Sequence, residues 1–77
     1  MDWVPLESSV LTRVAYFPVE SLLYLEVRNG GIYRYFKVPL QQYEELLASD
    51  SKGRYFGRNI RDHFPCEQIH PTLAWRG

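Results

Sequence analysis

Residues 22–38 read LLYLEVRNGGIYRYFKV, and this stretch decides the fold. Apolar and polar residues alternate on both sides of the Asn-Gly-Gly sequence at 29–31, and the β-branched and aromatic residues among them favour strands. Asparagine and glycine accept the positive φ angles that a tight turn requires. The stretch therefore predicts an antiparallel hairpin whose strands are Leu22–Arg28 and Ile32–Val38.

The register of this hairpin depends on the length of its turn, because a slip of one residue exchanges the two faces of a strand. A three-residue turn would place Glu26 opposite Arg34, whereas a two-residue turn would place Val27 opposite Ile32. The pattern of the sequence leaves both registers open.

The segments on either side of the hairpin complete the predicted fold. Ser9–Phe17 alternates in the same way and predicts a strand that precedes the hairpin. Beyond Pro39, Leu40–Ala48 carries apolar residues at helical spacing, and Lys52–Phe64 repeats large apolar residues every four positions until Pro65 ends it. We therefore predict an α+β fold of order β-β-β-α-α, in which a three-stranded antiparallel meander is followed by two helices that cover one face.

The length of the chain allows one domain, because 77 residues fall below the roughly 100–150 that a typical domain contains. We assign residues 8–65 to a single α+β domain, residues 1–7 to an irregular N-terminal lead and residues 66–77 to a C-terminal tail. Within the tail, a segment around Gln68 and Ile69 could pair with the sheet as a short edge strand. Trp75 either packs on the core or lies in a mobile end.

The composition indicates the compartment. The single cysteine, Cys66, excludes an intramolecular disulfide and favours a reducing environment. The N-terminus lacks the basic and apolar regions of a signal peptide, and no apolar stretch approaches the roughly 20 residues of a membrane helix. We therefore predict a cytoplasmic protein that makes no membrane contact.

The charges sum to zero but are unevenly distributed. Residues 1–27 carry one basic and four acidic residues, whereas residues 28–61 carry seven basic and three acidic ones. Between Lys52 and Arg61 there are four basic residues and no acidic one. Arginines on a helix beside exposed tyrosines suit a phosphate backbone with unstacked bases. Alternatively, this is a solvated face whose arginines pair with acidic residues, which would be Glu44, Glu45 and Asp62.

The aromatic residues of the third predicted strand are a second candidate feature. Tyr33 and Tyr35 share one face because side chains alternate along a strand, and an open face would make them a stacking platform for bases. If helices cover that face, both rings belong to the core instead. The candidate nucleic-acid-binding residues are Tyr33, Tyr35, Lys52, Arg54, Tyr55, Arg58 and Arg61.

Metal binding and catalysis have little support in the sequence. His63, Cys66 and His70 are types that bind zinc, but structural zinc sites usually draw four ligands from two paired segments. The sequence contains no nucleophile elbow, zinc-protease motif, phosphate-binding loop or dinucleotide fingerprint. We therefore expect no cofactor, no metal and no enzymatic activity.

The central part of the chain, residues 8–64, resembles the KTSC domain. This small family is named for the C-terminal domain of some lysyl-tRNA synthetases and also occurs as stand-alone bacterial or phage proteins. The resemblance rests on an ordered set of short matches. They are Ser8-Ser9-Val10, Tyr16, Leu25, Val27, Asn29-Gly30-Gly31, Tyr33, Tyr35, Val38-Pro39, Tyr43, Leu46-Leu47, Ser51-Lys52-Gly53, Tyr55-Phe56 and Asn59-Ile60-Arg61.

The resemblance implies RNA binding, which has been proposed for the family because of its attachment to synthetases. The leading hypothesis is a small non-enzymatic module that binds RNA or another nucleic acid through a basic helix face and sheet aromatics. The alternative is a module for protein interaction or small-ligand binding, which could be a homodimer. Its motivation is the surplus of aromatic rings, because a chain this short cannot bury all of them.

Overall fold

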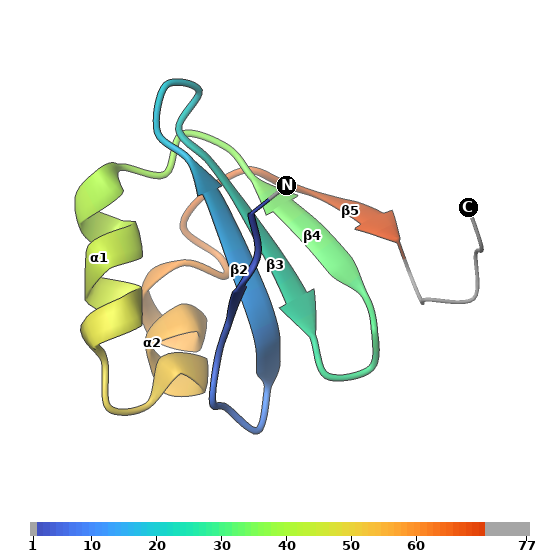
Figure 1. The fold of residues 1–77 in the computed structure, drawn as a ribbon. Helices are drawn as coiled ribbons and strands as arrows, with labels where there is room; N and C mark the ends of the chain where they lie inside the picture. The colour runs from blue at the N-terminus through green and yellow to red at the C-terminus, as the bar shows by residue number, and fades with distance from the viewer. Residues whose placement is uncertain (1, 71–77) are drawn as a thin grey trace.

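The computed structural model describes residues 2–70, which form a five-stranded antiparallel sheet with two helices on one side (Figure 1). The strands lie in chain order across the sheet, so each connection joins neighbours. The elements are β1 (Val4–Pro5), β2 (Leu11–Phe17), β3 (Leu22–Val27), β4 (Ile32–Tyr35), α1 (Leu40–Ala48), α2 (Lys52–Asn59) and β5 (Cys66–His70).

The predicted α+β class and the meander, β2-β3-β4, are confirmed, but the sheet contains two more strands than the three predicted. β5 contains the segment around Gln68 and Ile69 for which pairing with the sheet was one alternative, and it pairs with β4. β1 lies within the lead that was expected to be irregular, where Val4 pairs with Val14 of β2. Two residues that include a proline carry little strand signal, and such a segment suits only the edge of a sheet. Trp75 lies outside the described residues.

The register of the β3–β4 hairpin differs from both predicted registers, because the structure pairs Glu26 with Ile32. The turn consists of residues 28–30, and the Val27 N–H donates to the Gly31 carbonyl at 2.9 Å. The last residue of the turn is a glycine with a φ of 96°, which is the left-handed conformation expected at that position of a three-residue turn. The turn therefore starts one residue earlier than the Asn-Gly-Gly sequence suggested.

The core lies between the helices and the sheet face that they cover. Tyr16 of β2 stacks on Tyr43 of α1 with ring centroids 4.8 Å apart, and its hydroxyl donates to the Val38 carbonyl at 2.5 Å. Burial of these apolar side chains is the main force that holds the two layers together. The buried cluster consists of Leu6, Leu11, Val14, Leu23, Leu25, Tyr35, Val38, Leu46, Phe56 and Ile60.

The second helix is shorter than predicted, and this changes where Arg61 points. α2 ends at Asn59 rather than at Phe64. The N–H groups of Ile60 and Arg61 both donate to the Phe56 carbonyl, at 3.0 and 2.9 Å, which is a bonding pattern typical of helix C-termini. Arg61 therefore lies in the turn that follows α2 and does not continue the helix face of the other arginines. No helix within residues 2–70 is long and apolar enough to cross a membrane.

Candidate functional site

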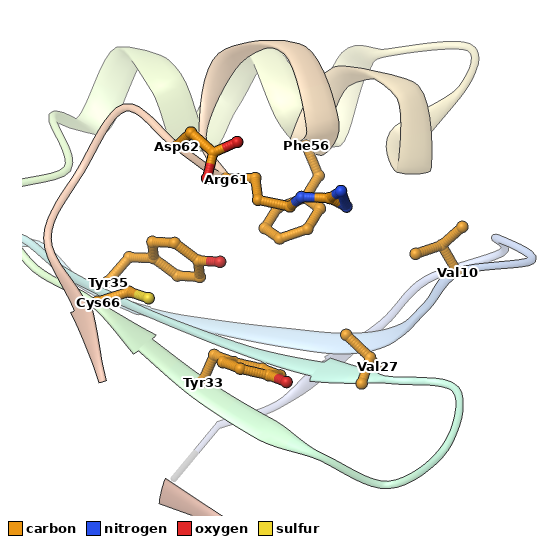
Figure 2. Close-up of a pocket in the computed structure, with 8 residues that line it drawn as sticks. All are labelled: Val10, Val27, Tyr33, Tyr35, Phe56, Arg61, Asp62 and Cys66. Carbon is orange, nitrogen blue, oxygen red and sulfur yellow. The ribbon is translucent and has the colours of Figure 1, made fainter. Parts of the chain in front are cut away.

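The structure separates the seven candidate residues into two neighbouring groups. One group lies along α2, on the side of the helix that faces away from the sheet and at its N-terminal end. The other lines a pocket between the sheet and the chain that follows α2 (Figure 2). The first group is Lys52, Arg54, Tyr55 and Arg58, and the second is Tyr33, Tyr35 and Arg61.

The outer face of α2 presents two exposed guanidinium groups. Phe56 turns inward to the core, so Arg54 and Arg58, which are one helical turn apart, lie on the opposite side of the helix and are exposed. Both line a shallow groove of about 300 Å³. The ion pairs among residues 2–70 involve only Arg13 and Arg34, so neither groove arginine has an acidic partner there.

Tyr55 ties α2 to α1 rather than projecting freely. Its hydroxyl donates to the Glu45 carboxylate at 2.6 Å and lies 2.8 Å from Oε1 of Gln42. Burial and the hydrogen bond to Glu45 raise the pKa of Tyr55 to about 12. The same contact, with a second from Gln41, lowers the pKa of Glu45. Glu45 therefore pairs with a tyrosine and an amide, and not with the arginines of α2.

Lys52 lies where the start of α2 meets the segment before β2. Its Nζ donates to the Ser49 carbonyl at 2.9 Å, and Ser51 caps the helix by accepting from the Arg54 N–H at 3.4 Å. The absence of a side chain at Gly53 allows this close approach, because a Cβ there would lie 3.0 Å from Cγ2 of Val10. Close packing and capping thus explain the Ser-Lys-Gly sequence structurally.

The pocket lies between β4 and the turn after α2 and has a volume of about 360 Å³. Figure 2 shows Tyr33 on the sheet side, with the Arg61 guanidinium and the Phe56 ring on the helix side. The Tyr35 hydroxyl and the Cys66 sulfur lie at one end, and two valines lie at the other. The lining residues are Val10, Val27, Tyr33, Tyr35, Phe56, Arg61, Asp62 and Cys66.

The two strand tyrosines share a face, as predicted, but they do not form a paired stacking platform. Tyr35 is only 3% exposed, because its ring packs edge-on against Phe56 with centroids 5.7 Å apart. Burial is the main reason why the pKa of Tyr35 is raised, with a further contribution from Cys66 beside it. Tyr35 therefore offers a protonated hydroxyl to the pocket, whereas Tyr33 keeps part of its ring accessible.

Sequence reasoning missed most of the pocket, because its residues come from distant parts of the chain. Val10 precedes β2, Val27 ends β3, and Asp62 and Cys66 follow α2. Phe56 belongs to the apolar repeat of the predicted helix, and no local pattern could bring these residues together. Among the side chains that the structure describes, no three His, Cys, Asp or Glu residues lie close enough to hold a metal ion.

Known proteins similar to this chain fall into two kinds. The sequence matches the KTSC domain over residues 7–64. A lysine–tRNA ligase from a Nostoc species is 44% identical over 63 residues, which are 82% of this chain but 11% of the ligase. A protein of Tsukamurella paurometabola is 35% identical over 60 residues, which are 78% of this chain and 90% of that protein.

A solved structure confirms the fold. The crystal structure of a KTSC domain protein from Yersinia pestis superposes with a TM-score of 0.86 at 31% sequence identity. The match covers 88% of this chain and 96% of the other, so the two proteins share the whole domain rather than a fragment. The ligase match, in contrast, concerns one small part of a much larger enzyme.

Proposed function

This chain belongs to the KTSC domain family, and we propose that it is a non-enzymatic module that binds RNA through the outer face of α2. The observation that carries the proposal is the pair Arg54 and Arg58. Both are exposed, they lie one turn apart in one groove, and neither has an acidic partner within residues 2–70. A phosphate can therefore approach either guanidinium without breaking an ion pair.

The chemistry of this face suits a phosphate backbone. A guanidinium presents its N–H groups as a planar fork that matches two phosphate oxygens, and such charge-assisted bonds are stronger than neutral ones. Arg61 is also exposed, but it lies in the turn beyond the helix and outside this face. Asp50 lines the same groove as Arg54 and Arg58, so we expect phosphates to lie toward the Arg58 end.

The sequence similarity to lysine–tRNA ligases favours RNA over other polyanions as the ligand. The related Nostoc enzyme is a lysine–tRNA ligase, and the matched segment is a small part of it. A segment that occurs both within such an enzyme and as most of a short protein behaves as an independent module. We place its action in the cytoplasm, in keeping with the single cysteine.

Fluorescence anisotropy with labelled single-stranded RNA and with tRNA at low salt tests the proposal. Replacing Arg54 and Arg58 by Gln removes two charges from α2, and we expect binding to weaken at least about tenfold. The matched control replaces Arg28 and Lys37 by Gln, which removes the same charge from positions outside α2. Equal weakening by both double variants, or no weakening by the first, would show that α2 is not the binding face.

A second candidate function, protein interaction, is favoured by the sheet face that the helices leave open. The Arg34 guanidinium lies 5.8 Å from the Tyr24 ring centroid and 5.3 Å from that of Phe36, and Phe17 packs against Tyr24. Partly exposed aromatic and arginine residues of this kind are enriched at protein interfaces. Light scattering coupled to size exclusion at two concentrations tests for a homodimer, and a monomer at both would count against that form of the candidate.

A further inference from the structure

We propose that the pocket between β4 and the turn after α2 binds the flat, uncharged ring of one nucleobase. The inference deepens the proposed function, on which it rests for the source of the base, an RNA strand. A volume of about 360 Å³ falls at the lower end of the range of small-molecule sites, roughly 300–1,000 Å³. The pocket therefore has room for a single ring system.

The two broad walls of the pocket suit a flat π-system. The ring of Tyr33 lies on the sheet side, and the ring of Phe56 and the guanidinium of Arg61 lie on the helix side (Figure 2). Aromatic rings and guanidinium planes are the surfaces on which proteins stack unpaired bases. Val10 and Val27 close one end with apolar groups, so a strongly polar ligand gains less there.

The charges at the pocket favour a neutral ring. Arg61 and Asp62 are both exposed and carry opposite charges, so their sum adds no net charge at the opening. At one end, the Tyr35 hydroxyl lies close to Cys66, and because burial raises the pKa of Tyr35 the hydroxyl stays protonated into alkaline solution. These groups can exchange hydrogen bonds with the polar edge of a base, while the walls hold its faces.

The position of the pocket connects it to the basic face of α2. Phe56 comes from α2 itself, and Arg61 follows the helix within one turn of Arg58. Because Arg54 and Arg58 lie on the side of α2 opposite Phe56, a strand whose phosphates lie on them must pass around the C-terminal end of α2 to place one unstacked base in the pocket. Free nucleosides carry the same ring without the phosphate backbone. Binding of a nucleoside therefore reports recognition of the base alone, separately from recognition of the strand.

Cys66 provides a direct readout of occupancy. It is the only cysteine in the sequence, it is exposed, and its sulfur faces the pocket. We expect millimolar adenosine, guanosine, cytidine or uridine to slow modification of Cys66 by a thiol reagent, with ribose alone as the control ligand. We also expect short RNA oligonucleotides to slow it at lower concentrations, whereas oligonucleotides made only of abasic nucleotides do not.

Variants of Tyr33 separate stacking from folding. Tyr33→Leu removes the ring but keeps an apolar side chain, and we expect it to weaken nucleoside protection of Cys66 about tenfold. Tyr33→Phe keeps the ring and should retain protection. The matched control is Tyr24→Leu, because Tyr24 points to the opposite face of the sheet.

The outcomes distinguish this inference from the proposed function. Protection by nucleosides that is lost in Tyr33→Leu supports the pocket, even if removing Arg54 and Arg58 leaves RNA affinity unchanged and the proposed function fails. Protection by RNA alone, lost in Tyr33→Leu, supports the pocket with the strand as its source. Unchanged Cys66 reactivity with every nucleoside and every oligonucleotide, in a protein that still binds RNA, would overturn the pocket but not the basic face.

Discussion

The two glycines of α2 give a matched pair of substitutions that tests how the helix is held on the sheet. A Cβ built at Gly57 would meet no atom within 4 Å, whereas one at Gly53 would lie 3.0 Å from Cγ2 and 3.2 Å from Cβ of Val10. Gly57→Ala therefore changes only the helix propensity. Gly53→Ala also requires the Val10 side chain or the start of α2 to shift by a few tenths of an ångström.

The expected magnitudes follow from these contacts. Alanine is favoured over glycine by about 1 kcal/mol inside a helix, so Gly57→Ala should raise the free energy of unfolding by up to that amount. Overpacking a tight contact costs about 1–3 kcal/mol, which at Gly53 cancels or exceeds the gain in propensity. Since 1 kcal/mol shifts the melting temperature of a domain this size by about 4–8 °C, Gly53→Ala should melt at least about 4 °C below Gly57→Ala.

Thermal unfolding followed by circular dichroism measures the difference directly. Combining Gly53→Ala with Val10→Ala removes the nearer of the two atoms in conflict, Cγ2, so we expect the double variant to recover part of the stability relative to the sum of the two single changes. Equal melting temperatures for the two glycine variants would refute the close approach, as would strict additivity with Val10→Ala.

Three further predictions concern ionisable groups. Tyr55→Phe removes the hydrogen bond that lowers the pKa of Glu45, so this pKa should return toward 4.5. A lowered carboxyl pKa contributes stability that is present above the ordinary pKa and is lost as pH falls, so in urea unfolding the wild type should lose stability below about pH 4.5 more steeply than Tyr55→Phe. Parallel plots of stability against pH for the two proteins would exclude the contact. In an alkaline absorbance titration, Tyr55 should ionise near pH 12 and Tyr35 should also ionise above its ordinary pKa of 10. The stability linked to Tyr55 should disappear as pH rises from 10 to about 12, and the absence of any ionisation above pH 11 would contradict both raised pKa values. Arg13→Ala removes the partner 2.7 Å from the buried Glu26 carboxylate and should cost about 1–3 kcal/mol, and adding Glu26→Gln should recover part of the loss.

The local parts of the fold were accessible from the sequence. The helix Leu40–Ala48 was predicted with its bounds, because Pro39 and the apolar spacing both mark it. The shared face of Tyr33 and Tyr35 also follows from strand alternation. Which face the helices cover does not follow, because it depends on the packing of α1 and α2 against residues far away in the chain.

The parts that failed depend on tertiary contacts or on single backbone angles. The hairpin register follows from the positive φ of Gly30, and Gly31, its neighbour in the sequence, was an equally good candidate for that place. Arg61 fits a helical period but leaves the helix, because Ile60 enters the core and the chain turns back toward β5. The pocket that Arg61 and Cys66 line therefore could not be predicted from spacing.

The salt dependence of RNA binding tests the central claim most directly. For single strands, log affinity decreases linearly with log salt concentration, and each phosphate contact that is lost makes this negative slope shallower by about 0.7. The double variant Arg54→Gln with Arg58→Gln should therefore reduce the magnitude of the slope by about 1.4. The control Arg28→Gln with Lys37→Gln should leave it unchanged. The same slope for wild type and both double variants would contradict phosphate binding by α2.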